Sequence, residues 1–283
     1  MNESSIFIVG AKGQLGLALQ QKYPGAQNAD IDELDITDQK SVETFDWSGI
    51  KIILNAAAYT NVDGAETPEG RRSAWQVNAV AVGHLQQVAT KLDMTLVHIS
   101  TDYVFDGSKN PHTEDEQFSP LSVYGASKAA GDIAVSLAPK HYILRTSWII
   151  GEGKNFVRTM LELGKKGVNP SVVSDQIGRL TFTSELVRAI DHLLSKKSEF
   201  GTYNISNDGD LASWANITRT IFETASFKNT VTDVTTEEYY RGKEGIAPRP
   251  LQSALDLAKI KATGFVPREW SDNLNEYIRK ELS

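Results

Sequence analysis

The amino-acid sequence predicts an α/β fold, in which a Rossmann-like parallel sheet is followed by a smaller C-terminal substrate-binding α/β region. Two observations carry this prediction. Short apolar, β-branched runs alternate with stretches of helical character through the first half of the chain, which is typical of βαβ units. A glycine-rich turn follows the first run, where such folds place the turn between their first strand and first helix.

The elements follow in chain order. The strands that we expect in the sheet are residues 6–9, 51–54, 95–99 and 141–144. Helices are expected between them at residues 14–22, 71–92 and 123–137. After Arg145 the alternation fades, and Gly151-Glu152-Gly153 marks a loop. Beyond it we expect helices at 155–164, 184–194, 211–225 and 270–282, a strand near 202–205 and a loop over 241–250.

The chain has no long linker and no internal repeat, so we expect its two regions to pack as one body with a cleft between them. Residues 1–150 are predicted to form the NAD(P)-binding Rossmann domain, with residues 176–200 returning to it. Residues 151–283 are predicted to form mainly the substrate-binding region.

The composition excludes several classes of function. The 283 residues contain no cysteine, which excludes disulfides, thiolate metal sites and thiol nucleophiles. A net charge of −7 disfavours a nucleic-acid backbone or a membrane surface as partner. The N-terminus lacks the basic segment and long apolar run of a signal peptide, so we expect a cytoplasmic protein.

Three glycines follow the first predicted strand at the spacing G-x-x-G-x-x-G, namely Gly10, Gly13 and Gly16. Glycine lets the backbone turn tightly and approach a pyrophosphate, whose charge then lies at the positive end of the following helix. An ordinary turn between strand and helix is the alternative, because glycines are common there. The context nevertheless favours a dinucleotide loop.

An acidic residue supports that interpretation. Asp30 stands near the expected end of the second strand, where a carboxylate can accept hydrogen bonds from the adenosine ribose. No arginine follows that strand to hold a 2′-phosphate, although Lys12 is placed to contact one. We therefore expect the chain to accept NADH or NADPH with at most modest discrimination.

Tyr124 and Lys128 are four residues apart, so both side chains lie on one face of the expected helix. An ammonium group beside a phenol favours the phenolate, which predicts a lowered pKa for Tyr124 and a role as proton donor to a developing alkoxide. Thr101 follows the strand at 95–99 and is placed to polarise a substrate carbonyl. The alternative for this pair is a solvated lysine beside a half-buried tyrosine.

The order of these features resembles the extended branch of the short-chain dehydrogenase/reductase superfamily, and within it the dTDP-4-dehydrorhamnose reductase family. The resemblance covers nearly the whole chain. Its motifs are Gly10 to Gly16, Leu34-Asp35-Ile36-Thr37-Asp38, Asn55 to Asp63, Ser100 to Phe105, Tyr124 with Lys128, Arg145-Thr146-Ser147-Trp148, Asn155-Phe156 and Asp175-Gln176-Ile177-Gly178.

The resemblance implies the remaining site residues. Cofactor contacts would be Gly10, Lys12, Gly13, Gln14, Leu15, Gly16, Asp30, Asp35, Ile36, Ala57, Ala58, Tyr59, Tyr124 and Lys128. Substrate contacts would be Thr101, Asp102, Trp148, Asn155, Gln176 and Arg249. Trp148 is otherwise a core aromatic residue, and Arg249 a surface arginine in a rigid loop. Leu180 stands where the family usually has proline, which leaves the conformation of that loop open.

The implied reaction is hydride transfer from NADPH or NADH to C4 of dTDP-4-dehydro-6-deoxy-L-mannose, giving dTDP-L-rhamnose, with Thr101, Tyr124 and Lys128 as catalytic residues. Two alternatives are a reductase of another dTDP-4-keto-6-deoxy sugar and a non-catalytic subunit that resembles the regulatory subunit of methionine adenosyltransferase. The five histidines lack ligand spacing, so no catalytic metal is predicted. Some relatives hold Mg²⁺ at a dimer contact, so a homodimer and an unassigned structural Mg²⁺ stay open.

Overall fold

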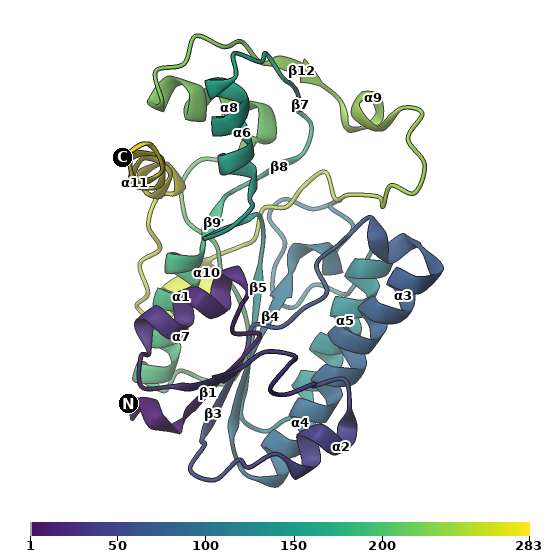
Figure 1. Cartoon of the computed structure of the whole chain (residues 1–283), viewed down its shortest axis with the longest axis vertical. Helices are drawn as coiled ribbons and strands as arrows, with labels where there is room; N and C mark the ends of the chain where they lie inside the picture. The colour runs from purple at the N-terminus through teal and green to yellow at the C-terminus, as the bar shows by residue number, and fades with distance from the viewer. Residues whose placement is uncertain (1) are drawn as a thin grey trace.

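The computed structural model describes residues 2–283, which are built around one six-stranded parallel sheet (Figure 1). The order across the sheet is β10-β5-β4-β3-β1-β2. Its strands are β1 (Ile6–Val9), β2 (Gln27–Ala29), β3 (Ile52–Asn55), β4 (Thr95–Thr101), β5 (His141–Thr146) and β10 (Gly201–Asn204). The predicted α/β fold with a parallel central sheet is therefore confirmed.

Helices cover both faces of this sheet, so its strands are buried on both sides. Along β1, Ile6 and Ile8 pack toward one face and Phe7 and Val9 toward the other, as the two-residue period of a strand requires. Helices α1 (Gln14–Lys22) and α7 (Thr183–Lys196) cover the first face. Helices α2 (Gln39–Thr44), α4 (Ala81–Lys91) and α5 (Val123–Ser136) cover the second.

The helix predicted over 71–92 is three consecutive segments. It begins as α3 (Pro68–Trp75), with Thr67 as the capping residue and Pro68 at its first position. A π-helical turn, η3 (Gln76–Val80), then leads into α4. This turn directs the side chain of Asn78 inward, where it hydrogen-bonds the backbone of Tyr59 and the hydroxyl of Ser127.

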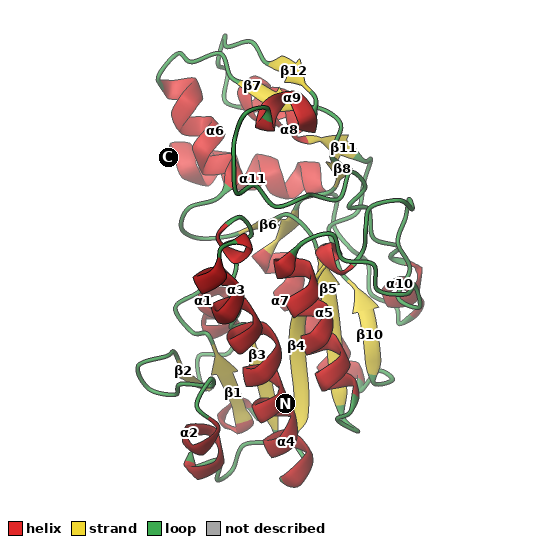
Figure 2. Ribbon diagram, turned by 90° about the vertical axis from the view of Figure 1, so that its right-hand side faces the viewer, coloured by secondary structure: helices red, strands yellow, loops and turns green. Residues whose placement is uncertain are grey.

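A second group of elements lies beyond the carboxyl ends of the strands (Figures 1 and 2). Its core contains residues of α6 (Phe156–Lys165), α8 (Trp214–Thr224) and α11 (Trp270–Leu282). Three short strand pairs join them. These are β6 (Ile149–Ile150) with β9 (Thr181–Phe182), β7 (Ser171–Val173) with β12 (Thr232–Val234), and β8 (Ile177–Gly178) with β11 (Ala212–Ser213). Leu180, which stands between β8 and β9, is fully buried in this core.

The remaining helical segments are short. They are η1 (Glu3–Ser5), η2 (Gly64–Glu66), η4 (Asp102–Val104), α9 (Thr236–Tyr240) and α10 (Ala258–Ala262). The loop predicted over 241–250 contains no helix or strand. Across residues 2–283, no helix combines the length and the apolar character that a membrane span needs.

The sequence places a division near residue 150, and this division stays a prediction. Helix α7 packs against α1, and β10 pairs with β5, so the residues 183–204 lie on the sheet. By contrast, β8 and β9 pair with strands outside it. We therefore propose that the returning segment begins at α7 rather than at residue 176.

Two glycines allow α1 to approach β1 and β3 closely. A Cβ on Gly16 would lie 2.2 Å from the backbone oxygen of Gly10, and a Cβ on Gly10 would lie 2.6 Å from the backbone nitrogen of Ala57. Gly10 also has a φ of +79°, which favours glycine. The turn between β1 and α1 therefore has no room for a side chain at either position.

We expect Gly16→Ala to lower the free energy of unfolding by about 1–3 kcal/mol, because the added methyl group meets backbone rather than a movable side chain. Gly83→Ala in α4 is the matched control, since nothing lies within 4 Å of its Cβ position. That control should be neutral or stabilising by up to about 1 kcal/mol. Urea unfolding of both variants measures the difference, and equal effects would contradict the packing argument.

Candidate active site

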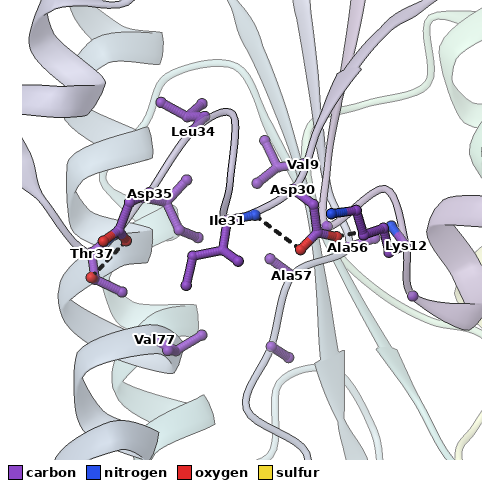
Figure 3. Close-up of a pocket in the computed structure, with 14 residues that line it drawn as sticks. Val9, Lys12, Asp30, Ile31, Leu34, Asp35, Thr37, Ala56, Ala57 and Val77 are labelled. Carbon is purple, nitrogen blue, oxygen red and sulfur yellow. Dashed lines mark hydrogen bonds between the residues drawn. The ribbon is translucent and has the colours of Figure 1, made fainter.

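The strand order reverses between β1 and β3, and a cleft of about 380 Å³ opens at their carboxyl ends (Figure 3). Parallel sheets bind ligands at this kind of switch point, because the loops from the two strands run in opposite directions there. The cleft is lined by Val9, Gly10, Lys12, Gly13, Asp30, Ile31, Leu34, Asp35, Ile36, Thr37, Ala56, Ala57, Ala58 and Val77.

Eight of the residues predicted to contact the cofactor line this cleft, namely Gly10, Lys12, Gly13, Asp30, Asp35, Ile36, Ala57 and Ala58. Gln14, Leu15 and Gly16 instead form the first turn of α1, and Tyr59 follows Ala58 in the chain. No side chain caps that first turn and none of its residues is acidic, so its N–H groups and helix dipole suit an anion. The side-chain-free cradle of Gly10 and Gly16 and this helix end fit the pyrophosphate of a dinucleotide.

The acidic end of β2 is already hydrogen-bonded to the glycine turn. Asp30 accepts hydrogen bonds from the backbone nitrogens of Lys12 and Ile31, both at 2.9 Å. The Lys12 ammonium pairs with the carboxylate of Asp32 at 2.6 Å, and both side chains are largely exposed. Lys12 thus lies at the rim of the cleft, and its ammonium group forms an ion pair with Asp32.

The wall opposite the glycine turn is formed by the segment that follows Asp30. Asp35 accepts hydrogen bonds from the backbone nitrogen of Thr37 at 2.9 Å and from its hydroxyl at 2.7 Å. Ile31, Leu34 and Val77 add apolar surface that the sequence did not indicate as part of the site. Val77 belongs to η3, so only the three-dimensional fold brings it here.

Thr101 and Tyr124 lie at the carboxyl end of β4, the strand next to β3. Ser122 caps α5 by accepting a hydrogen bond from Gly125, which fixes Tyr124 in the first turn of the helix. The Thr101 hydroxyl donates to Asp102 Oδ1 at 3.0 Å. The ring of Tyr124 packs edge-to-face against Tyr103, with 5.6 Å between the ring centres.

Burial dominates the electrostatics of Tyr124. Loss of water raises the pKa of its phenol above the usual value, the charge of Asp102 raises it further, and the Thr101 side chain opposes the rise. The expectation that Lys128 lowers this pKa is wrong for the structure. The Lys128 amino group instead donates to Ile99 O at 2.6 Å and lies 3.2 Å from His98 Nε2, and Lys128 is not among the groups that shift the pKa of Tyr124.

Two buried carboxyl groups lie near this region: Asp132, which the sequence did not indicate, and Asp102, which it predicted as a substrate contact. Asp132, one turn after Lys128 on α5, accepts a hydrogen bond from Arg145 at 3.0 Å, and both side chains are buried. Asp102 has one carboxylate oxygen, Oδ2, with no hydrogen-bonding partner. Burial raises the pKa of Asp102 to about 6. An unpaired buried acceptor is costly, and such groups are typical of ligand sites.

Trp148 has a backbone φ of +48°, which is unusual for a bulky residue and is typical of functional sites. Its indole stacks on that of Trp214, with 3.8 Å between ring centres. Gln176 lies beside this stack, accepting from Trp214 Nε1 at 3.2 Å and donating to Thr236 at 3.1 Å. The structure thus brings Trp148 and Gln176 together through Trp214.

Asn155 and Arg249 are both engaged within the fold. Asn155 caps α6 by accepting from the backbone nitrogen of Arg158, and its amide nitrogen donates to Gly151 O and Tyr277. Arg249 forms a two-pronged pair with the carboxylate of Asp63, one contact measuring 2.8 Å. Asn155 therefore caps the N-terminus of α6, whereas Arg249 holds the 241–250 loop near η2.

Within the part of the chain that the structure describes, no three His, Asp or Glu side chains gather as a metal site would require. The sequence analysis assigned no role in the site to His98, Trp214 or Asn55, although Asn55 opens one of the family motifs. His98 had one available signal, since it is a polar residue within an otherwise apolar strand run.

Comparison with known proteins identifies relatives over nearly the whole chain. A family model described as the RmlD substrate binding domain matches residues 4–283. The Bacillus subtilis spore coat polysaccharide biosynthesis protein SpsK is 37% identical, over 99% of each chain. A dTDP-4-dehydrorhamnose reductase from Aggregatibacter actinomycetemcomitans is 37% identical, over 94% of this chain and 95% of the relative.

Among solved structures, that of the Bacillus anthracis dTDP-4-dehydrorhamnose reductase in complex with NADP superimposes with a TM-score of 0.89. The two sequences are 36% identical, and the match covers 98% of each chain. The fold, the order of the motifs and these relatives agree, and the chain belongs to the dTDP-4-dehydrorhamnose reductase family.

Proposed function

We propose that this protein reduces the C4 keto group of dTDP-4-dehydro-6-deoxy-L-mannose with NADPH or NADH, giving dTDP-L-rhamnose as the last step of dTDP-rhamnose biosynthesis. The observation that carries the proposal is the buried phenol of Tyr124 beside Thr101. Thr101 ends β4, the neighbour of β3, and the cleft that suits a dinucleotide lies at the ends of β1 and β3. Membership of the family supports the choice of substrate.

The cleft at the end of β1 and β3 would hold the adenosine and pyrophosphate of the cofactor. The backbone of Gly13 to Gly16 would bind the pyrophosphate, and Asp30 and Asp35 would border the ribose. A relative bound to NADP supports this assignment. When bound, the nicotinamide cofactor supplies the hydride.

Tyr124 would donate the proton to the developing alkoxide. Its raised pKa keeps the phenol protonated at neutral pH, so the proton is available when the carbonyl oxygen gains charge. Thr101 would orient that oxygen by hydrogen bonding. Lys128, as an ammonium group, would then stabilise the phenolate that remains.

The substrate would lie between the end of β4 and the second group of elements. The Asp102 carboxyl group would accept from a sugar hydroxyl, and the indole of Trp148 would supply aromatic surface for the sugar. Arg249 would have to exchange Asp63 for the diphosphate. Gln176 and Asn155 would act mainly by holding Trp214 and α6 in place.

The proposal includes a cytoplasmic location, because both reactants are highly charged phosphorylated molecules. A homodimer and a structural Mg²⁺ stay predictions that rest on the resemblance alone.

The direct test mixes purified protein with NADPH or NADH and enzymatically generated dTDP-4-dehydro-6-deoxy-L-mannose. We expect loss of reduced-cofactor absorbance and formation of dTDP-L-rhamnose, identified by chromatography. Oxidation with a different product would indicate a reductase of another keto sugar. Cofactor binding without any oxidation would favour the regulatory-subunit alternative.

We expect Tyr124→Phe to lower kcat by about 10²–10⁴-fold, because it removes a general acid without emptying the pocket. The dissociation constant of NADPH should stay close to wild type in a fluorescence titration. Tyr142→Phe is the matched control, since the Tyr142 hydroxyl donates to Ser198 O away from the site. Wild-type turnover in Tyr124→Phe would exclude this tyrosine as the proton donor.

Lys128→Met should lower kcat and weaken NADPH binding, each by about tenfold or more, since a hydrogen bond from a charged group contributes about 1.5–3 kcal/mol. Steady-state kinetics and titration measure the two effects separately. Lys140→Met, which removes an exposed pair with Asp93, is the control and should change neither. An effect on kcat alone would argue against a contact with the cofactor.

NADH and NADPH should bind with dissociation constants within about tenfold of each other, because only the exposed Lys12 is placed to meet a 2′-phosphate and it is shared with Asp32. Lys12→Ala should weaken NADPH binding by at most about fivefold and leave NADH binding unchanged. A preference for NADPH of a hundredfold or more would show that another cation reads the phosphate.

A further inference from the structure

His98 is a fully buried residue of β4 whose imidazole ring contacts the amino group of Lys128. Its two ring nitrogens each have one partner: Nδ1 lies 3.0 Å from Asn55 Nδ2, and Nε2 lies 3.2 Å from Lys128 Nζ. Gly131 on α5 lies close to the same region: a Cβ there would lie 2.2 Å from the backbone oxygen of Asn78 and 3.6 Å from His98 Nε2. The three residues form a continuous chain from β3 through β4 to α5.

The orientation of the Asn55 amide is fixed by the backbone. The N–H of Ala57 donates to Asn55 Oδ1 at 3.1 Å, so the oxygen must lie on that side. The amide nitrogen, which can only donate, therefore faces His98 Nδ1. Nδ1 must accept this hydrogen bond, and it carries no proton.

A neutral imidazole with an unprotonated Nδ1 has its proton on Nε2. This Nε2–H points at Lys128 Nζ, which itself donates to Ile99 O at 2.6 Å. An ammonium group has no acceptor to offer, so a charged Lys128 would set two donors against each other. An uncharged amine resolves the conflict, because its lone pair accepts from His98.

We propose that His98, held by Asn55 with its proton on Nε2, is a positioning residue that favours the uncharged amine form of Lys128 in the resting protein. The inference rests on the proposed function at one point, because stabilising the Tyr124 phenolate requires the ammonium form of Lys128. At a pH where this amine is uncharged, recruitment of Lys128 to cofactor and substrate is then accompanied by uptake of one proton.

The charged groups around Lys128 act in both directions. Asp132 on the same helix favours the ammonium form; its Oδ2 is paired with Arg145 of β5, and its buried Oδ1 has no hydrogen-bond partner. Tyr124 is protonated, and Asp102 of η4 faces the phenol rather than the amine. Burial lowers the pKa of Lys128 to about 8, and burial also lowers the pKa of His98 well below its usual range.

The tautomer of His98 is the direct test and needs neither cofactor nor turnover. Histidine-selective ¹⁵N labelling and long-range ¹H–¹⁵N spectra of the cofactor-free protein distinguish the two tautomers, and His98→Leu assigns the signal. We expect neutral His98 with Nε2 protonated at pH 9, where Lys128 is uncharged. Protonation of Nδ1, or of both nitrogens, would overturn the proposal whatever the enzyme reduces.

Proton uptake on binding is the second test. Titration calorimetry of NADPH at pH 9, in buffers of different ionisation enthalpy, should give close to one proton taken up, and near zero at pH 6.5. Because binding favours the charged lysine, the dissociation constant should rise up to about tenfold per pH unit above pH 8. Tight binding without uptake at pH 9 would overturn the inference and leave the proposed function intact.

Asn55→Asp separates positioning from packing. A carboxylate still accepts from Ala57 but cannot donate, so His98 should move its proton to Nδ1 and accept from a charged Lys128. Proton uptake at pH 9 should then vanish while the variant stays folded. His192→Gln is the control, since His192 lies on α7 and bonds Thr263, and both readouts should match wild type. Unchanged uptake in Asn55→Asp would contradict the relay.

Discussion

The whole arrangement depends on one contact between backbones, at the point where the ends of β1 and β3 meet. Gly10 lies so close to Ala57 that no side chain fits between them. Hydrogen bonds from Gly10 and Ala11 to Ala29 O, and from Ala56 to Val9 O, join the ends of β1, β2 and β3. These bonds hold open the cleft and fix the first turn of α1 beside it. The same loop after β3 carries Ala57, which orients Asn55 and through it His98.

Burial of charge is the second constraint. α5 carries Tyr124, Lys128 and Asp132 on one buried face, so each ionisable group must have a partner or stay neutral. Asp132 has Arg145, whose guanidinium also lies over the rings of Phe105 and Phe118. Tyr124 stays protonated. The Nε2–H of His98, which faces Lys128, favours the uncharged form of the third group until a ligand binds.

Local signals explain how much of the fold was predictable. Helices α1 and α11 have the predicted bounds, because each follows a clear break in a periodic pattern. Strands of two residues such as β6 and β8 have too few positions for a two-residue period to be visible, so the sequence did not indicate them. The split of the 71–92 helix was also missed, since nothing local in Gln76–Val80 marks a π-helical turn.

The candidate site divides in the same way. The glycine turn, Asp30, Thr101 and Tyr124 were found because each follows a strand or opens a helix. The partners of Lys128 and Arg249 were not predictable. Lys128 and His98 are separated by 30 positions in the sequence, and Arg249 and Asp63 by 186, and contacts over such separations leave no local pattern. The predicted direction of the Tyr124 pKa shift was wrong for that reason. The spacing of two residues on a helix does not determine which groups a flexible lysine side chain contacts.

The pair between Arg249 and Asp63 has a consequence for ligand discrimination. Any anion that takes the guanidinium must replace a carboxylate that already makes two contacts, and it leaves Asp63 without its partner. A singly charged group exchanges like for like and gains little, whereas a diphosphate brings more charge than the carboxylate it displaces. The loop would therefore select against weakly charged ligands through competition within the chain, before any sugar is recognised.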